Sequence, residues 1–505
     1  MIKQTKLSSP SDWLLPLCIA AATLTAWFLN TLIFGATPES AMLAWLALIA
    51  IYLIGLVWLH LRGVSLRDAA IPLIIVAGFL MQLLPVFRLP YAFSNHDLGE
   101  FGALTDSTIN GGHLGFINYL VKFGRLPTDV NPMIPEFRDF YHPPVYHIIQ
   151  AVFFRLNLLL GIPPEAALEN LQILTLLAGS LCQWMICRIM QQLGISHKGT
   201  CIGLLFTAFQ PAFLIFSATP NNDIFSIFFI LLTILYALRW AETQTLRNII
   251  GAGIALGLGM GTKLSVGIIA LPLGLIFALR FFQNLADWKR YIRQFSVFLL
   301  ISVPLGTAWQ IFHAIAYQAP LNYVPTPAET ISLSHLPRAM RFGFPDPEAL
   351  RSLFYSGIRK LDYNVWFQTL KTALFDELVL FPTGSPMWYT SYWLTALFAL
   401  LMLVSAVLFV RLLLIRKTTL KPVDKLFLLV YGMALLGSYL LFCSQYAYVC
   451  TFNFRYIMPI LLLCAVALGD YCSKKKSLLS KLLIGLTALF AALSCFVYIV
   501  YLWGA

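Results

Sequence analysis

The chain has 505 residues, of which 59% are apolar and 11% charged, whereas about a quarter of the residues of an average soluble domain are charged. Together with a mean hydropathy of +0.79, this composition excludes an ordinary soluble protein and predicts an integral membrane protein. The net charge of +12 requires no nucleic-acid partner, because membrane proteins concentrate Lys and Arg in their cytoplasmic loops.

The sequence contains a series of apolar segments, most of them near the length of about 17–25 residues that a helix needs to cross a bilayer. They predict an all-α polytopic bundle of about thirteen transmembrane helices. In chain order the segments lie at 13–34, 41–60, 69–88, 171–190, 199–218, 223–240, 248–262, 264–282, 294–316, 388–410, 425–443, 454–471 and 482–503.

The distribution of Lys and Arg predicts the orientation of this bundle. Most basic residues fall in every second connection, beginning with Lys3 and Lys6 and ending with the run at 474–481. Since cytoplasmic loops carry such an excess, we expect the N-terminus in the cytoplasm of a cell with this protein in its inner (plasma) membrane, and the C-terminus outside. Two long loops, about 89–170 and 319–387, then lie on the outer side.

These loops divide the chain into four parts. We expect two additional N-terminal transmembrane helices at 1–68, a catalytic core at 69–318 that contains the first outer loop 89–170, an outer lobe at 319–387, and C-terminal transmembrane helices at 388–505. The apolar stretch 143–160 would reverse every later loop if it crossed the membrane. It is therefore predicted to be a juxtamembrane helix with His147, Gln150 and Arg155 toward the headgroups, although a true crossing is the alternative.

The first outer loop gathers residues that can carry chemistry, and Asp97 is the strongest candidate among them. It follows the end of an apolar segment near Arg88 by about nine residues, which places it close to the outer membrane boundary. A partly desolvated carboxylate there has a raised pKa and suits a base that takes a proton from a hydroxyl or amine. For most of the other acids in this loop, simple solvation is the better interpretation.

Three further ionisable residues are expected at the same outer level. Asp223 follows Asn221-Asn222 and by position alone would cap the next helix. Lys263 stands between two short apolar segments, where it could snorkel to the surface or bind an anion. Arg455 begins an apolar segment from the outside, and because a cation is unfavourable at a helix N-terminus, this position favours a ligand or a carboxylate partner.

A base and two cations facing away from the cytoplasm suggest a transferase whose substrate carries its own leaving group. The sequence contains neither a Walker motif nor a dinucleotide-binding fingerprint, and a sugar on a polyprenyl phosphate would meet this requirement. The alternatives are a transporter or lipid flippase, and a non-catalytic protein that binds prenyl-linked sugars. A transporter predicts ionisable residues near helix midpoints and an internal repeat, whereas here the predicted spans are nearly free of charge.

At several places the sequence resembles family 39-like glycosyltransferases of the GT-C superfamily, relatives of the protein O-mannosyltransferases and the lipid A aminoarabinose transferases. The resemblance covers roughly residues 69–471. The segments that carry it are Asn95-His96-Asp97-Leu98-Gly99-Glu100-Phe101, Gly112-His113-Leu114-Gly115-Phe116-Ile117, Gly124-Arg125-Leu126-Pro127, Phe140-Tyr141-His142-Pro143-Pro144, Pro220-Asn221-Asn222-Asp223, Thr262-Lys263 and Asn453-Phe454-Arg455-Tyr456-Ile457-Met458-Pro459.

The resemblance implies a GT-C-type bundle and an inverting transfer of sugar from a polyprenyl-phosphate donor to a lipid, glycan or protein acceptor. It implies that Asp97 is the base and that Lys263 and Arg455 lie near the donor phosphate. Glu100 is a second catalytic candidate, although the family often has an adjacent Asp-Glu pair where this chain has Leu98 after Asp97. Further substrate-site candidates are His96, His113, Tyr141, His142, Asp223 and Tyr456.

No cofactor is expected for this chemistry. The spacing of His96, His113 and His142 matches no standard metal site, so we expect no metal, with a divalent ion as the open alternative.

Overall fold

The computed structural model describes residues 11–35, 37–94, 111–327, 329–354, 361–415, 418–474 and 477–504. These residues form helices and no β-strand, apart from an isolated bridge between Ser332 and Tyr448. The predicted all-α polytopic fold is therefore confirmed.

Within the described ranges, ten helical segments are long and apolar enough to cross a membrane. Each coincides with one of the thirteen segments predicted from the sequence. The helices are α1 (Ser11–Ile33), α2 (Pro38–Leu61), α3 (Leu66–Arg88), α7 (Leu171–Gln192), α10 (Asp223–Thr243), α12 (Ala270–Gln283) with the preceding 3-10 turn η3 (Leu264–Ile269), α13 (Trp288–Tyr317), α17 (Pro386–Leu414), α18 (Pro422–Gln445) and α20 (Leu478–Gly504).

The other three predicted spans are helical but bent or short. Helices α8 (His197–Ala208) and α9 (Pro211–Ser217) meet at an angle of 59°, because Pro211 has no backbone N–H to continue the helix. Helix α11 (Leu246–Met260) has 15 residues and α19 (Leu461–Lys474) has 14. Apolar composition predicted these helices, and the segment 248–262 already had the short length of α11, but composition did not reveal the bend between α8 and α9.

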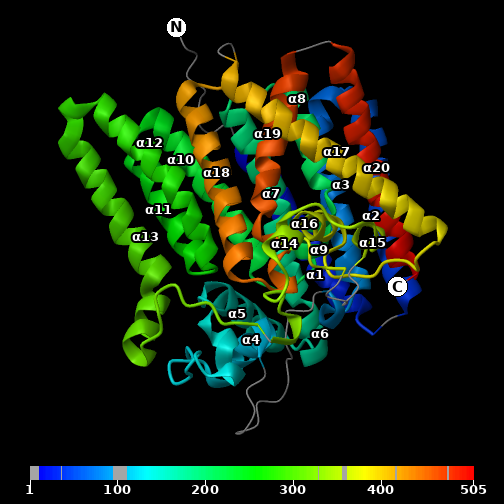
Figure 1. The fold of residues 1–505 in the computed structure, drawn as a ribbon. Coiled ribbons are helices and arrows are strands. Elements are labelled where there is room, and N and C mark those ends of the chain that lie inside the picture. Colours follow the sequence, from blue (N-terminus) through cyan, green and yellow to red (C-terminus); the bar gives the residue numbers. More distant parts are fainter. Residues whose placement is uncertain are drawn as a thin grey trace.

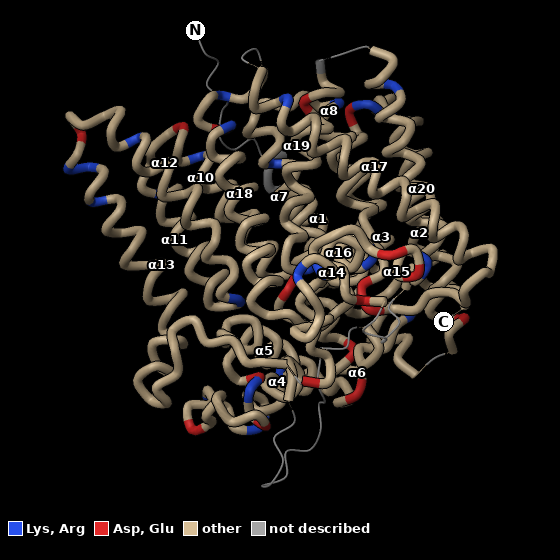
Figure 2. Tube along the Cα trace, viewed as in Figure 1, with Lys and Arg blue, Asp and Glu red and all other residues tan. Residues whose placement is uncertain are grey.

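Short helices gather at one end of the bundle, which we call the outer end (Figure 1). Figure 2 shows that Lys and Arg gather in the connections at the opposite end, in agreement with the basic connections that predict the orientation. The outer end carries η1 (Tyr91–Phe93), α4 (Gly112–Phe123), η2 (Pro135–Tyr141), α5 (Val145–Leu159), α6 (Pro164–Glu169), η5 (Glu329–Ile331), α14 (Arg338–Phe342), α15 (Pro347–Arg351), α16 (Val365–Phe375), η6 (Val449–Thr451), η7 (Phe454–Tyr456) and η8 (Met458–Ile460); η4 (Leu285–Asp287) precedes α13.

Helix α5 is the predicted helix at 143–160, but its orientation about its own axis differs from the prediction. His147 and Gln150 are buried inside the protein rather than turned toward headgroups. The exposed face is apolar and includes Val152 and Leu159, which are 64% and 84% exposed. A helix that lies at a membrane places its apolar face toward the lipid, so the polar face of α5 is free to line the interior of the outer end.

The N-terminal helix α1 docks on this outer end through buried polar groups. The Trp27 Nε1–H donates to Asn157 Oδ1 at 2.9 Å, and Asn30 Nδ2 donates to Asn170 Oδ1 at 3.0 Å. Asn170 Nδ2 in turn donates to Asn157 Oδ1 at 2.8 Å. These hydrogen bonds tie α1 to the segment from α5 to α7 and thereby hold α5 in its register.

Candidate functional site

The centre of the candidate site is the carboxylate of Asp223, which lies between two cations. Lys263 Nζ forms an ion pair and hydrogen bond with Oδ1 of Asp223, and Arg455 Nη1 lies 3.8 Å from Oδ2. The side chains of Asp223, Lys263 and Arg455 are 3%, 17% and 5% exposed. The structure thus brings both predicted phosphate-binding cations to one buried acid.

The connection before α10 aims the carboxylate at these cations. Asn222, not Asp223, occupies the N-cap position of α10, and its side chain donates to the Thr262 carbonyl at 3.1 Å instead of capping the helix. The Asn221 side chain accepts from the Asp223 N–H at 3.0 Å. Because Thr262 immediately precedes Lys263, the Asn222 bond fixes the lysine segment next to α10, and Asp223 serves the ion pair rather than the cap.

Arg455 is held by an irregular segment between α18 and α19. The Asn453 side chain accepts from the Arg455 N–H at 2.9 Å and donates to Asp376 Oδ1 at 2.7 Å. Tyr456 completes the arrangement, since its ring lies 4.8 Å from Lys263 Nζ and 5.1 Å from the Arg455 guanidinium carbon. Such irregular backbone is tolerated near a membrane only where protein covers it or where it lines a cavity.

A cluster of histidines from α4 and α5 lies beside the cations. His113 Nδ1 is 3.0 Å from His147 Nε2, and the two rings stack with centroids 5.3 Å apart. The ring of His142 lies 4.7 Å from that of His113, and Tyr146 meets His147 edge to face at 5.2 Å. A hydrogen bond between two imidazoles requires one nitrogen to donate and the other to accept, so the tautomers of the His113 and His147 rings are coupled.

The electrostatic surroundings keep His142 neutral. Burial lowers the pKa of His142 well below its usual value, and His113, His147, Lys263 and Arg455 lower this pKa further. Among the described residues, the cluster thus combines two cations, Lys263 and Arg455, with the carboxylate of Asp223. Such a cluster at the outer end of the bundle is suited to hold an anionic group.

The predicted site residues fall into two groups. His113, His142, Asp223, Lys263, Arg455 and Tyr456 come together, and Tyr141 stacks on His142 with centroids 4.1 Å apart. His96, Asp97 and Glu100 lie outside the residues that the structure describes.

Tyr146 and His147 also belong to this cluster, although the sequence analysis did not count them among the site residues. His147 occurs five residues after His142, close enough for both imidazoles to reach one cluster across the Pro143-Pro144 turn. This spacing is the feature of the sequence from which His147 could have been predicted as a site residue.

Among the described residues, no group of three His, Cys, Asp or Glu side chains is arranged to hold a metal ion. The rings of His113 and His147 are stacked, and the His142 ring is tilted against both. The ring centroid of Phe116 lies 4.2 Å from that of His147.

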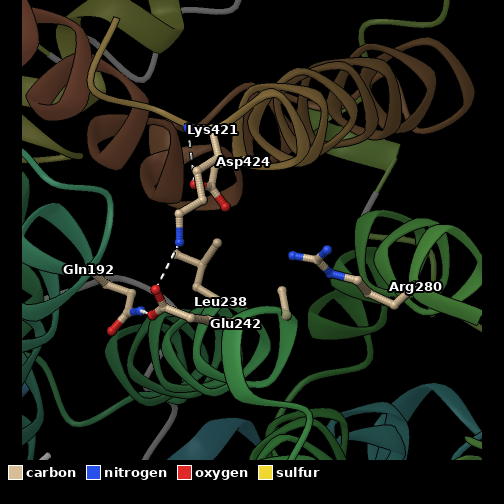
Figure 3. A pocket seen from close by; sticks show the side chains of 7 residues that line it. Gln192, Leu238, Glu242, Arg280, Lys421 and Asp424 are labelled. Atoms are coloured by element: carbon tan, nitrogen blue, oxygen red, sulfur yellow. Dashed lines mark hydrogen bonds and ion pairs between the residues drawn. The ribbon is translucent and has the colours of Figure 1, made fainter. Parts of the chain in front are cut away.

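A second polar pocket lies at the opposite end of the bundle, where α7, α10, α12 and α18 meet (Figure 3). Lys421 Nζ lies 2.8 Å from Glu242 Oε1, and Gln192 Nε2 donates to Glu242 Oε2 at 2.6 Å. Arg280, which also lines the pocket, donates from Nη1 to Gln283 Oε1 at 3.1 Å. Asp424 accepts from the Lys421 N–H at 3.3 Å at the start of α18. These bonds join helix ends and give the pocket a structural role.

Comparison with known proteins finds that part of the chain is similar to one family. The family model described as dolichyl-phosphate-mannose-protein mannosyltransferase matches residues 141–307. This range includes Tyr141, His142, Asp223 and Lys263. No curated protein matches the sequence.

Solved structures with a similar arrangement share little sequence with this chain. ArnT from Cupriavidus metallidurans bound to undecaprenyl phosphate is 12% identical, with a TM-score of 0.46 over 85% of this chain and 76% of that one. The oligosaccharyltransferase AglB from Archaeoglobus fulgidus, in complex with an inhibitory peptide and a dolichol-phosphate, is 13% identical, with a TM-score of 0.45 over 87% of this chain. The match spans only 56% of AglB.

The family match covers about a third of the chain, whereas the resemblance read from the sequence extended over roughly 69–471. Within residues 141–307 the predicted resemblance is confirmed, and there this membrane protein is similar to the dolichyl-phosphate-mannose-protein mannosyltransferase family.

Proposed function

We propose that this protein is a glycosyltransferase that transfers a sugar from a polyprenyl-phosphate donor to an acceptor on the outer side of the membrane, with inversion at the anomeric carbon. The observation that carries the proposal is the buried Lys263–Asp223–Arg455 cluster at the outer end. The match of residues 141–307 to the family described as dolichyl-phosphate-mannose-protein mannosyltransferase supports a polyprenyl-phosphate sugar as the donor.

The cations suit a leaving phosphate for an electrostatic reason. Without a ligand, a single carboxylate is shared between Lys263 and Arg455, and Arg455 Nη1 is still 3.8 Å from it. This is longer than the 2.7–2.9 Å of a good charge-assisted hydrogen bond. A phosphate provides several oxygens and can bind both cations at once, which suits the charge that develops on a leaving phosphate.

The reaction that follows from these residues is a direct displacement. Asp97 takes the proton from an acceptor hydroxyl or amine, and the freed electron pair forms the new bond to the anomeric carbon. The bond from that carbon to the phosphate oxygen breaks, and the lipid phosphate leaves with the electron pair toward Lys263 and Arg455. Because attack and departure occur on opposite faces of the sugar, the configuration inverts.

The position of the site also argues against a transport pathway through the bundle. Asp223 is the first residue of α10, and Lys263 lies in the connection after α11. Charges that serve transport are expected near the membrane midplane. Because Lys and Arg gather at the opposite end of the bundle, the proposal includes a cytoplasmic N-terminus and a site on the outer side.

The experiment that tests the donor site measures binding of a short-chain prenyl phosphate to the purified protein. Lys263→Gln or Arg455→Gln should weaken binding by roughly 1.5–3 kcal/mol, which is what a charge-assisted hydrogen bond to a buried phosphate contributes. Arg125→Gln is the matched control, since Arg125 is 56% exposed and pairs with Asp129. Equal affinity in the wild type and in both site variants would remove Lys263 and Arg455 from the donor site.

A further inference from the structure

The outer lobe contains a buried arginine, Arg341, whose printed contact is the neighbouring Phe342 ring, 6.0 Å from its guanidinium carbon. Helix α14 carries two arginines, of which Arg338 is exposed and Arg341 is only 6% exposed. Within the described part of the chain, Nε and Nη1 of Arg341 have no hydrogen-bond partner. Burial lowers the pKa of Arg341, Arg338 lowers it further, and no carboxylate of the described residues raises it.

This arrangement is costly unless something compensates the charge. A buried cation without a counter-charge loses its hydration and gains nothing in return. A long arginine side chain ordinarily extends its head into water, as Arg338 does on the same helix. Arg341 instead keeps its guanidinium inside the lobe, which points to a ligand that is absent from the isolated chain.

The backbone around Arg341 is fixed by the neighbouring helix α16. Asn364 Nδ2 donates to the carbonyls of Met340 and Gly343 at 3.3 and 2.8 Å. The Trp366 Nε1–H donates to the Phe342 carbonyl at 2.7 Å. The buried guanidinium is thus preorganised on a short helix that is anchored on both sides of it.

The same helix α16 also supports the segment of the candidate donor site. The Thr372 hydroxyl accepts from the Phe454 N–H at 2.9 Å, one residue before Arg455. Figure 1 shows α14 and α16 at the outer end, where α18 ends. Helix α16 therefore supports both Arg341 and the segment of Arg455, but Arg341 is not one of the donor-site cations.

We propose that Arg341 is a binding site for an oxyanion, a carboxylate or a phosphate, distinct from the Lys263–Arg455 pair. The planar guanidinium offers parallel N–H donors that match the two oxygens of such a group. The group belongs either to a water-soluble acceptor or to a lipid headgroup at the outer surface. The inference does not depend on the transferase reaction.

The test is the thermal unfolding of the purified full chain in a neutral maltoside detergent. Inorganic phosphate is the soluble probe and dihexanoyl phosphatidylglycerol is the headgroup probe. The variants are Arg341→Met, which removes the charge but keeps an extended apolar side chain, and Arg341→Lys, which keeps the charge but not the parallel donors. Arg338→Gln is the matched control, because it removes an exposed cation from the same helix.

Without a probe, we expect Arg341→Met to unfold at or above the midpoint temperature of the wild type, because an uncompensated buried charge has gone. With a probe, the midpoint of the wild type and of Arg338→Gln should rise, since a ligand that binds only the folded state stabilises it. Arg341→Met should lose this rise and Arg341→Lys should keep a smaller one. A rise with inorganic phosphate assigns the site to a soluble anionic group, and a rise with the lipid alone assigns it to a headgroup.

Lys263→Gln separates this site from the donor site. A midpoint shift that survives in Lys263→Gln but disappears in Arg341→Met belongs to Arg341, whatever the fate of the donor assignment. If neither probe shifts the wild type, if the shift persists in Arg341→Met, or if Arg341→Met unfolds well below the wild type without any probe, the oxyanion site is refuted and Arg341 is a structural residue.

Discussion

Asp223→Asn separates the contribution of the carboxylate to stability from its competition with a ligand. The change keeps the shape of the side chain but leaves Lys263 and Arg455 without their shared counter-charge. Breaking a buried ion pair from one side costs about 3–5 kcal/mol. A Coulomb interaction across about 4 Å, at an effective dielectric constant of about 20, gives a similar figure of roughly 4 kcal/mol. The ligand-free variant should therefore be clearly less stable than the wild type.

The same change should strengthen the binding of a prenyl phosphate. In the wild type the phosphate must compete with Asp223 for the two cations, whereas in the variant it meets cations that no longer pair with Asp223. If one additional charge-assisted hydrogen bond of about 1.5–3 kcal/mol becomes available to the ligand, affinity should rise roughly 10- to 150-fold. Loss of stability and gain of affinity in one variant are a combined signature that a purely structural ion pair would not give.

The assay is thermal unfolding in detergent, with and without a short-chain prenyl phosphate, followed by a direct binding titration. Glu165→Gln is the control, because it removes an exposed carboxylate from α6 at the same end of the bundle. Asp223→Asn should unfold earlier than the control without ligand and gain more from the ligand. If Asp223→Asn binds the ligand no better than Glu165→Gln, the cations do not exchange Asp223 for phosphate and the proposed donor site fails.

Three further predictions test the base, the histidine cluster and the orientation. Asp97→Asn should reduce sugar transfer by about 10²–10⁴-fold, the usual effect of losing a general base, and leave prenyl-phosphate binding unchanged; normal transfer would exclude Asp97 as the base. Because the pKa of His142 is lowered in the folded state, the unfolded chain takes up this proton first as pH falls below about 6.5. Stability should therefore decrease from pH 7.5 to 5, and His142→Gln should flatten that slope; an unchanged slope would contradict a neutral His142. A cysteine in place of the exposed Glu348 should react with an impermeant reagent on intact cells. A cysteine in place of the exposed Thr245 should react only after permeabilisation. The reverse pattern would show that the orientation of the bundle, and with it the side of the site, is inverted.

The helical architecture could be predicted from the sequence because it depends on local composition. A backbone in hydrocarbon must satisfy its own hydrogen bonds, so each long apolar segment has to be a helix. All thirteen predicted segments are helical in the structure, and the excess of Lys and Arg in alternate connections gathers at one end. The bend between α8 and α9 could not be predicted in this way, since the packing of neighbouring helices determines how much of a segment continues straight.

The sequence also indicated Lys263 and Arg455 as cations in unusual places, but only the tertiary structure decided what they share. Position alone favoured a capping role for Asp223, because a helix N-terminus attracts carboxylates whatever lies opposite. The counter-charges come from residues 40 and 232 positions further along the chain, and no local pattern encodes such contacts. Likewise, the sequence showed that α5 is amphipathic, but only the packing against α4 decided that His147 faces inward. The reason is that polar side chains can find hydrogen-bond partners in a protein interior as well as at a membrane surface.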